Sequence, residues 1–244
     1  MLTIKRSRDV RTRFAREEEP TTDRLGRRRT PVNTPGCRKG LPAPNRGMKL
    51  PAEVYTPAEI ARLLKACGRG PAGARNSALL IVLWRGGLRC AEACALELRD
   101  VDREQGTLRV RHGKGDKART VGMDPQAFAI IERWLTVRGK LRIPRGAPLF
   151  CTFSHGSIGR QLGGGYVRSM VKRIARHAGI DKRVHPHGLR HTCATELMRE
   201  KVAVKLIQVQ LGHTSLSVTQ RYLDHLHPGE VIDAMQARHW PLPG

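Results

Sequence analysis

The fold is predicted from a pattern in the last third of the chain: His185-Pro186-His187-Gly188-Leu189-Arg190-His191, followed by Leu211-Gly212-His213 and then Tyr222. It places four histidines, one arginine and one tyrosine at fixed spacings among residues typical of helices. Together these side chains can bind a phosphodiester, transfer protons around it and attack it covalently without a metal. A complete phosphate-handling site would require further residues from elsewhere in the chain.

The charge balance of the chain indicates a polyanionic partner. Its 244 residues, enough for one large or two small domains, contain 45 Lys and Arg against 21 Asp and Glu, a net charge of +24. Aromatic residues make up only 4%, which disfavours a single-strand binder that relies on base stacking. Contact with the backbone of double-stranded DNA is the better interpretation, although a ribosome-associated or merely basic protein would have a similar charge.

Cysteine usage and the N-terminus bear on metal binding and location. The six cysteines form no CxxC pair, and Cys90 and Cys94, one helical turn apart, are half a metal site or, as we favour, two small residues near a core. No cluster of carboxylates accompanies the basic residues, which disfavours a metal-dependent nuclease. The sequence shows no signal peptide and no transmembrane run, so we expect a cytoplasmic protein that binds no membrane, metal or cofactor.

Two regions are expected along the chain. Residues 1–50 hold 14 Lys and Arg, 5 Asp and Glu and five prolines, without hydrophobic periodicity, which predicts a disordered basic tail. This tail is either an arm along DNA phosphates or a solvated segment, and the sequence leaves both open. Residues 51–244 are predicted to form the ordered domain.

The predicted elements of this domain are mostly helical. Thr56-Pro57-Ala58-Glu59 has the capping-box pattern of a helix start, and a helix from Ala74 to Arg85, apolar nearly all round, is expected to be central. Alternation over 107–111 and 118–121, around a turn at 113–117, predicts a β-hairpin. The other elements expected are helices at 88–98, 125–137, 165–178, 186–201, 204–211, 217–224 and 230–238, and a short strand at 149–151. The fold class is therefore α+β, mostly α, with one small antiparallel sheet.

Arginines are the natural ligands of a reacting phosphodiester, because each guanidinium is planar, charged and a bidentate donor. Arg190 lies one turn from His187, so both should project from one face at the start of their helix. Arg89 is the best candidate for a second arginine, since it follows Gly86-Gly87 and opens a helix that carries Glu92 one turn later. Glu92 either orients neighbouring groups or forms an ordinary surface pair with Arg89.

These segments together resemble the tyrosine recombinase (phage integrase) family. The resemblance rests on five segments in register over about residues 50–225, listed here in order: Gly87-Leu88-Arg89-Cys90-Ala91-Glu92, Gly113-Lys114-Gly115, His187-Gly188-Leu189-Arg190-His191, Leu211-Gly212-His213 and Tyr222. It implies a helical catalytic domain, and an enzyme of mobile elements that integrates or recombines double-stranded DNA without cofactors.

The resemblance also implies a role for each matching residue. Arg89 and Arg190 would clamp the scissile phosphate, and Tyr222 would attack it to form a 3′-phosphotyrosyl link. Lys114 would protonate the leaving 5′ hydroxyl, and His187 would assist proton transfer from the tyrosine. His213 would hydrogen-bond a non-bridging oxygen.

Other candidate residues are expected to support the site or to lie outside it. His191 either packs behind the groups that react or caps the helix surface, and we favour a structural role; Glu92, if it orients neighbouring groups, is expected to do so from behind them. Of the three tyrosines, Tyr55 and Tyr166 are expected to be packing or surface residues. A phenol has a pKa of about 10, so Tyr222 would need the nearby cations to react at neutral pH.

The resemblance implies assembly as well. Residues 226–244 correspond to a C-terminal helix that in such recombinases docks on a neighbouring protomer within a tetramer; packing within the same chain is the alternative. Family members typically carry an N-terminal helical domain, for which residues 1–50 offer only a basic tail. A non-catalytic DNA-binding remnant and an enzyme like type IB topoisomerases therefore remain alternatives, and the target site is not predicted.

Overall fold

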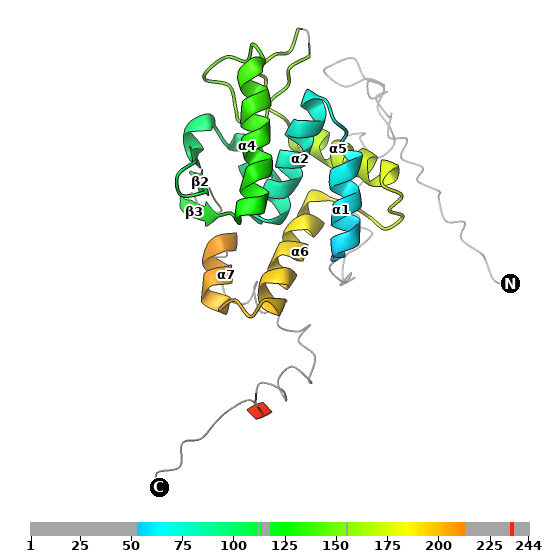
Figure 1. The fold of residues 1–244 in the computed structure, drawn as a ribbon, viewed down its shortest axis with the longest axis vertical. Coiled ribbons are helices and arrows are strands. Elements are labelled where there is room, and N and C mark those ends of the chain that lie inside the picture. The colour runs from blue at the N-terminus through cyan, green and yellow to red at the C-terminus, as the bar shows by residue number, and fades with distance from the viewer. Residues whose placement is uncertain (1–52, 112, 114–117, 155, 213–234, 237–244) are drawn as a thin grey trace, which may run out of the picture. The chain divides into compact units, whose positions relative to one another are not determined.

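The computed structural model describes residues 53–111, 113, 118–154, 156–212 and 235–236. In this part of the chain the domain is mostly helical, with one small sheet at its side, which confirms the predicted fold class (Figure 1). The elements, in chain order, are α1 Pro57–Ala66, α2 Pro71–Trp84, α3 Cys90–Ala95, the 3-10 helix η1 Leu98–Asp100, β1 Val101–Asp102, β2 Thr107–Val110, β3 Arg119–Gly122, α4 Pro125–Lys140, α5 Gly164–His177, α6 Pro186–Arg199 and α7 Val204–Leu211.

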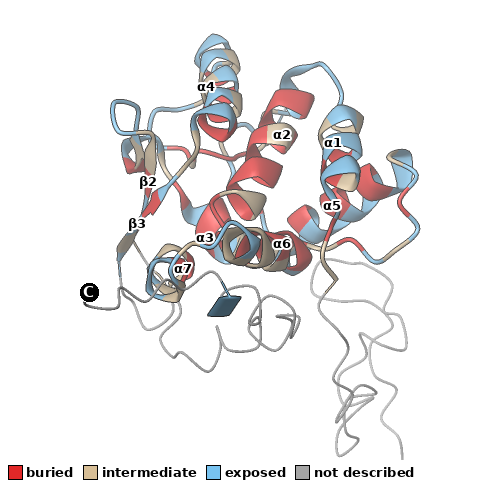
Figure 2. Cartoon of the chain, turned by 60° about the horizontal axis from the view of Figure 1, so that its bottom comes forward, coloured by how far each residue is buried: buried red, intermediate tan, exposed pale blue. Residues whose placement is uncertain are grey.

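Helix α2 forms the centre of the domain, as its all-round apolar sequence predicts. It packs against α3, α4 and α6, and Figure 2 shows its ribbon as mostly buried. The side chains of Leu79, Val82 and Leu83 are fully buried. Burying an aliphatic side chain of this size contributes about 1.5–3 kcal/mol, so the helix anchors the elements that carry the site.

Helix α1 begins as the capping-box pattern predicts. The Thr56 side chain accepts a hydrogen bond from the Glu59 N–H at 3.2 Å, and the Glu59 carboxylate accepts one from the Thr56 N–H at 2.8 Å. Ile60 and Leu63 form its buried face, and the helix packs against α5.

The sheet is antiparallel with strand order β1-β2-β3. The predicted hairpin strands are confirmed as β2 and β3, which pair with Val110 opposite Arg119 and Leu108 opposite Val121. The sequence did not reveal β1, which pairs Val101 with Leu108. Helix α7 packs on β3, and side chains of both hairpin strands, Leu108, Val110 and Val121, are buried in the main hydrophobic core.

Several predicted boundaries were wrong. The helix expected at 88–98 is only Cys90–Ala95, because Leu96 turns to an extended conformation and its carbonyl accepts a hydrogen bond from the Leu149 N–H at 2.6 Å. The strand expected at 149–151 is reduced to one bridge between Cys151 and Gln161. Helix α6 ends at Arg199 rather than 201, since Lys201 takes a left-handed φ of 59°.

Smaller differences affect three other helices, and some predictions cannot be compared. The helices expected at 74–85, 125–137 and 165–178 run over 71–84, 125–140 and 164–177, and the one expected at 204–211 has those bounds. The predicted tail at 1–50, the helix at 217–224 and all but two residues of the helix at 230–238 lie outside the described residues. Within the described ranges, no helix is both long and apolar enough to cross a membrane.

Candidate active site

Arg89 stands at the start of α3, after a tight turn. Gly87 has a φ of +60°, and a Cβ there would lie 2.4 Å from Leu211 Cδ2, so the turn admits only glycine without rearrangement. Arg89 itself is extended and caps α3, its N–H donating to Glu92 Oε2 at 2.8 Å. Its Nη1 donates to Glu92 Oε1 at 2.7 Å, and the Arg89 side chain keeps 30% of its surface exposed.

Glu92 is a buried carboxylate shared between two arginines. Arg119 donates from Nη1 to Glu92 Oε1 at 3.0 Å and from Nη2 to Oε2 at 2.8 Å. Burial disfavours the charged form of Glu92, but the hydrogen bonds from Arg119 and Arg89 outweigh burial and lower its pKa to about 2. Of the two interpretations of Glu92, the geometry agrees with the orienting one, because its side chain is only 4% exposed.

Arg119 is the functional candidate that the sequence reasoning missed. It is the first residue of β3, opposite Val110 and on the same face as Val121, both of which are buried. A charged residue at a core-facing strand position requires a partner. That position was the available signal, and Glu92 is the partner.

Helix α6 places His187 and Arg190. Its N-cap is His185, whose Nδ1 accepts a hydrogen bond from the Gly188 N–H at 3.1 Å. Tyr55 packs on this first turn: its hydroxyl accepts from the His185 N–H at 3.1 Å, and a Cβ at Gly188 would lie 2.4 Å from that hydroxyl. The contact explains the glycine of the motif, since only a residue without a side chain lets Tyr55 approach this closely.

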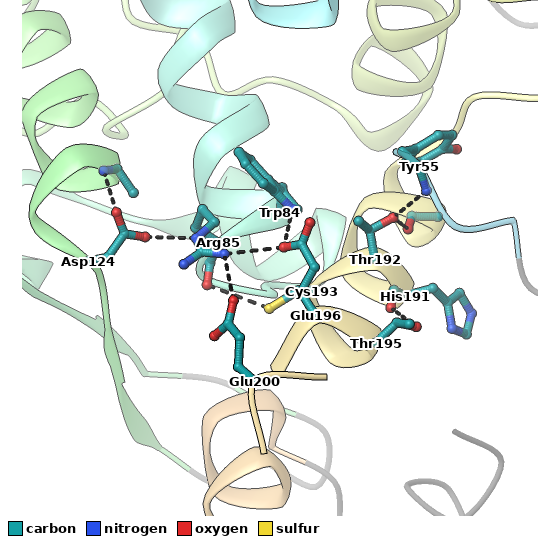
Figure 3. Close-up of polar contacts among 12 residues, drawn as sticks. Tyr55, Trp84, Arg85, Asp124, His191, Thr192, Cys193, Thr195, Glu196 and Glu200 are labelled. Carbon is teal, nitrogen blue, oxygen red and sulfur yellow. Dashed lines mark hydrogen bonds and ion pairs between the residues drawn. The ribbon is translucent and has the colours of Figure 1, made fainter. Parts of the chain in front are cut away.

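Polar contacts fix α6 in its middle and towards its end, as Figure 3 shows. The Tyr55 N–H donates to Thr192 Oγ1 at 2.9 Å in the middle of the helix. Towards its end, Arg85 donates to Glu196 Oε2 at 3.2 Å and, on its other side, to Asp124 Oδ2 at 2.7 Å. Arg85 follows α2 and Asp124 caps α4, so three helices meet at one guanidinium.

Arg190 and His187 differ in exposure although they lie one turn apart. Arg190 is 2% exposed, and it donates from Nη1 to the Gly87 carbonyl and from Nη2 to the Leu211 carbonyl at 2.6 Å. His187 is exposed, with its ring edge-on to His191 at a centroid distance of 4.2 Å. Partial burial of the imidazole, followed by the charge of Arg190 and smaller contributions from His185 and Arg89, lowers the pKa of His187.

Three arginines converge on the C-terminal end of α7. The carbonyls of Gln210, Leu211 and Gly212 accept hydrogen bonds from Arg119 Nε at 3.1 Å, Arg190 Nη2 at 2.6 Å and Arg89 Nη2 at 3.1 Å, respectively. The last carbonyls of a helix carry partial negative charge, which cations stabilise. The predicted arginines Arg89 and Arg190 therefore bind neighbouring carbonyls, those of Gly212 and Leu211, which directly precede His213 in the sequence.

Lys114, His213 and Tyr222 lie outside the described residues, so their positions are not compared. Of the other two tyrosines, Tyr55 is buried, which raises its pKa to about 12. Tyr166 is 41% exposed and accepts a hydrogen bond from Arg75 Nη2 at 2.7 Å. Both agree with the expectation that they are packing or surface residues.

Cys90 and Cys94 follow Arg89 on α3. The neighbouring Cys94 thiol and, to a smaller extent, Arg168 lower the pKa of Cys90 to about 7. Among the described residues, no group of three His, Cys, Asp or Glu side chains is arranged to hold a metal ion.

A basic groove begins beside the N-terminus of α6. It has a volume of about 600 Å³ and is formed by α5 and the segment that leads into α6. Its charged and imidazole-bearing lining residues are Arg168, Lys172, Arg176, Asp181, Lys182, Arg183 and His185. Five cations against one carboxylate give this groove the charge expected of a polyanion site. His185 lies at the groove and is two residues from His187.

Known proteins are similar to this chain in sequence and in fold. The sequence model of the phage integrase family matches residues 53–227. The chain belongs to the phage integrase family. Among the relatives of this integrase-family chain, tyrosine recombinase XerC of Xanthomonas axonopodis pv. citri (strain 306) is 35% identical over 200 residues, covering 81% of this chain and 63% of that protein. XerC of Shewanella sp. (strain ANA-3) is 34% identical over 202 residues, covering 82% and 65%.

Solved structures agree with this membership. The crystal structure of XerA recombinase matches with a TM-score of 0.65 and 30% identity, covering 77% of this chain and 66% of that one. XerH site-specific recombinase, bound to difH substrate in a pre-cleavage complex, matches with a TM-score of 0.60 and 29% identity, covering 77% and 54%. This integrase-family chain therefore spans less than two thirds of the length of these relatives.

Proposed function

We propose that this chain is the catalytic part of a site-specific DNA recombinase, which cleaves and rejoins double-stranded DNA through a 3′-phosphotyrosyl intermediate. The observation that carries the proposal is the convergence of Arg89 and Arg190 on the carbonyls at the end of α7, with His187 one helical turn before Arg190. Membership of the phage integrase family and similarity to tyrosine recombinases support it.

The proposed clamp consists of Arg89 and Arg190. Arg89 presents a partly exposed guanidinium, and Arg190 is held from behind by the Gly87 and Leu211 carbonyls. Donors fixed before the substrate arrives need no reorganisation when negative charge develops on the phosphate, and this lowers the barrier. These contacts therefore favour a preorganised clamp over two mobile surface arginines.

His187 is suited to accept the proton of the attacking phenol. Because burial and the neighbouring cations lower its pKa, the imidazole is neutral at neutral pH and keeps a nitrogen lone pair. Tyr222 is proposed as the nucleophile, Lys114 as the acid that protonates the 5′ hydroxyl, and His213 as a donor to a non-bridging oxygen. These three roles rest on the family motifs.

The partner we propose is double-stranded DNA, with one phosphate backbone along the basic groove of α5. Lys172, Arg176 and Arg183 supply groove cations that need no particular base sequence, and His185 connects the groove to the clamp. The complex of XerH with difH supports a DNA partner. On DNA we propose a tetramer of this chain, which sedimentation of the complex would test.

A nicked suicide substrate tests the proposal. The DNA site is first selected from a random duplex library by sequencing bound molecules, and is then nicked beside the cleavage position. The wild-type protein is expected to form a covalent adduct that survives denaturation, and Tyr222→Phe to form none. Tyr166→Phe is the matched control, because it removes an exposed phenol hydroxyl and should preserve the adduct.

Other outcomes identify the alternatives. Binding of the selected site with no adduct would contradict the enzymatic proposal and indicate a DNA-binding protein. Relaxation of supercoiled DNA by the monomer, at any sequence, would indicate a topoisomerase-like activity instead.

A further inference from the structure

We propose that Arg119 is a positioning residue: together with Glu92 it fixes both the guanidinium of Arg89 and the end of α7 for DNA cleavage. This inference rests on the proposed function. The Arg119 side chain is only 9% exposed, so little of it is accessible to DNA. The positioning role requires no contact with DNA.

The first step of the argument is the shared carboxylate. Glu92 Oε1 accepts hydrogen bonds from Arg119 Nη1 at 3.0 Å and from Arg89 Nη1 at 2.7 Å. Arg119 also occupies Oε2, at 2.8 Å, so that the carboxylate is held by a fork of two parallel bonds. A carboxylate fixed in this way gives Arg89 one preferred orientation.

The second step concerns the path of the chain after α7. Arg119 Nε donates to the Gln210 carbonyl at 3.1 Å, and a Cβ at Gly212 would lie 2.9 Å from the Arg119 Cζ. Gly212 has a φ of +64° and ends the helix directly on the Arg119 side chain. One side chain therefore determines where Arg89 lies and where the chain departs towards His213.

Charge alone does not explain these contacts. A lysine at position 119 would keep the positive charge, but a single ammonium cannot span both Glu92 oxygens and the Gln210 carbonyl in the same plane. The conservative variant Arg119→Lys therefore separates the electrostatic contribution of the residue from its geometric one.

The test compares single-turnover cleavage of the suicide substrate by wild type and Arg119→Lys at saturating DNA, with the Kd measured separately. We expect the rate constant to fall about 10-fold to 100-fold, as for a misplaced catalytic group. The Kd should change by less than about twofold, because no phosphate contact is lost. Arg109→Lys is the matched control, since Arg109 is an exposed arginine on the neighbouring strand, and it should cleave at the wild-type rate.

A second variant and a second measurement keep the inference falsifiable. In Arg119→Ala, added methylguanidinium should restore cleavage at least in part, and ethylammonium should not. Amide hydrogen exchange at 209–212 should accelerate in Arg119→Lys while that of α2 is unchanged.

Wild-type cleavage by Arg119→Lys, or a loss of DNA affinity in step with the rate, would overturn the positioning role. If even the wild type forms no adduct, the proposed function fails. In that case the inference is tested by hydrogen exchange alone, and unchanged exchange at 209–212 in Arg119→Lys would overturn it.

Discussion

Replacing Glu92 by glutamine should remove a large, pH-dependent contribution to the stability of the fold. The pKa of Glu92 is lowered from its ordinary value of 4.5 to about 2, and its side chain is 4% exposed, so solvent screening is small. At about 1.4 kcal/mol per pKa unit, the difference corresponds to about 3 kcal/mol of folding free energy at neutral pH. Because the folded state holds the proton more weakly, this contribution is complete above pH 4.5 and is lost as the pH falls towards 2.

Urea denaturation of wild type and Glu92→Gln between pH 7 and pH 3 measures this contribution. The difference in unfolding free energy should be about 3 kcal/mol at pH 7, and should shrink by about 1 kcal/mol at pH 4 and by about 2 kcal/mol at pH 3. Glu132→Gln is the control, because the ion pair of Glu132 with Arg103 is largely exposed and should give no comparable difference. A difference that does not vary with pH would refute the assignment of the low pKa to Glu92.

Three further predictions follow from the site. Gly87→Ala should destabilise the fold by about 2–4 kcal/mol, because the new Cβ meets Leu211 and the φ is positive, and urea denaturation would show it. The cleavage rate should decline as the pH drops through a His187 pKa below the ordinary 6.5, and His187→Gln should be slower and lack this transition. Lys172→Gln should reduce the slope of log binding constant against log salt by about 1, while Lys65→Gln, exposed on α1, should leave it unchanged.

Much of the fold was predictable because local signals and tertiary packing agree. The capping box at Thr56 and Glu59 appears in the structure as hydrogen bonds, and the all-round apolar run of α2 is the buried centre of the domain. The predictions failed where a distant segment competes with local preference. Leu96 illustrates this, because its carbonyl bonds Leu149 instead of continuing α3, and no pattern near residue 96 encodes that pairing.

The types of side chain in the candidate site could be predicted from the sequence, but the contacts that hold them in place could not. The spacing of His187 and Arg190 and the helix start at Arg89 give side chains whose type suits a phosphate. The sequence did not show that Arg190 is buried against carbonyls from two other segments, because those contacts span 103 and 21 residues. Arg119 was not predicted for the same reason. A strand of four residues is too short to show which of its side chains face the core, and the partner of Arg119, Glu92, lies in a different element.

The charges around the end of α7 indicate which state of the reaction the site would stabilise most. In the described part of the chain, the Glu92 carboxylate accepts hydrogen bonds from Arg89 and Arg119, and the guanidinium of Arg190 donates to the Leu211 carbonyl beside them. Partial burial of the His187 imidazole is the main cause of its lowered pKa, and the positive charges of Arg190 and Arg89 add to this effect. A phosphodiester carries one negative charge, and the pentavalent transition state of its cleavage carries about two, so a fixed excess of positive charge binds the transition state more tightly. The carbonyls of α7 hold the arginines in place before DNA binds, and a site built in this way would act on the barrier more than on DNA affinity.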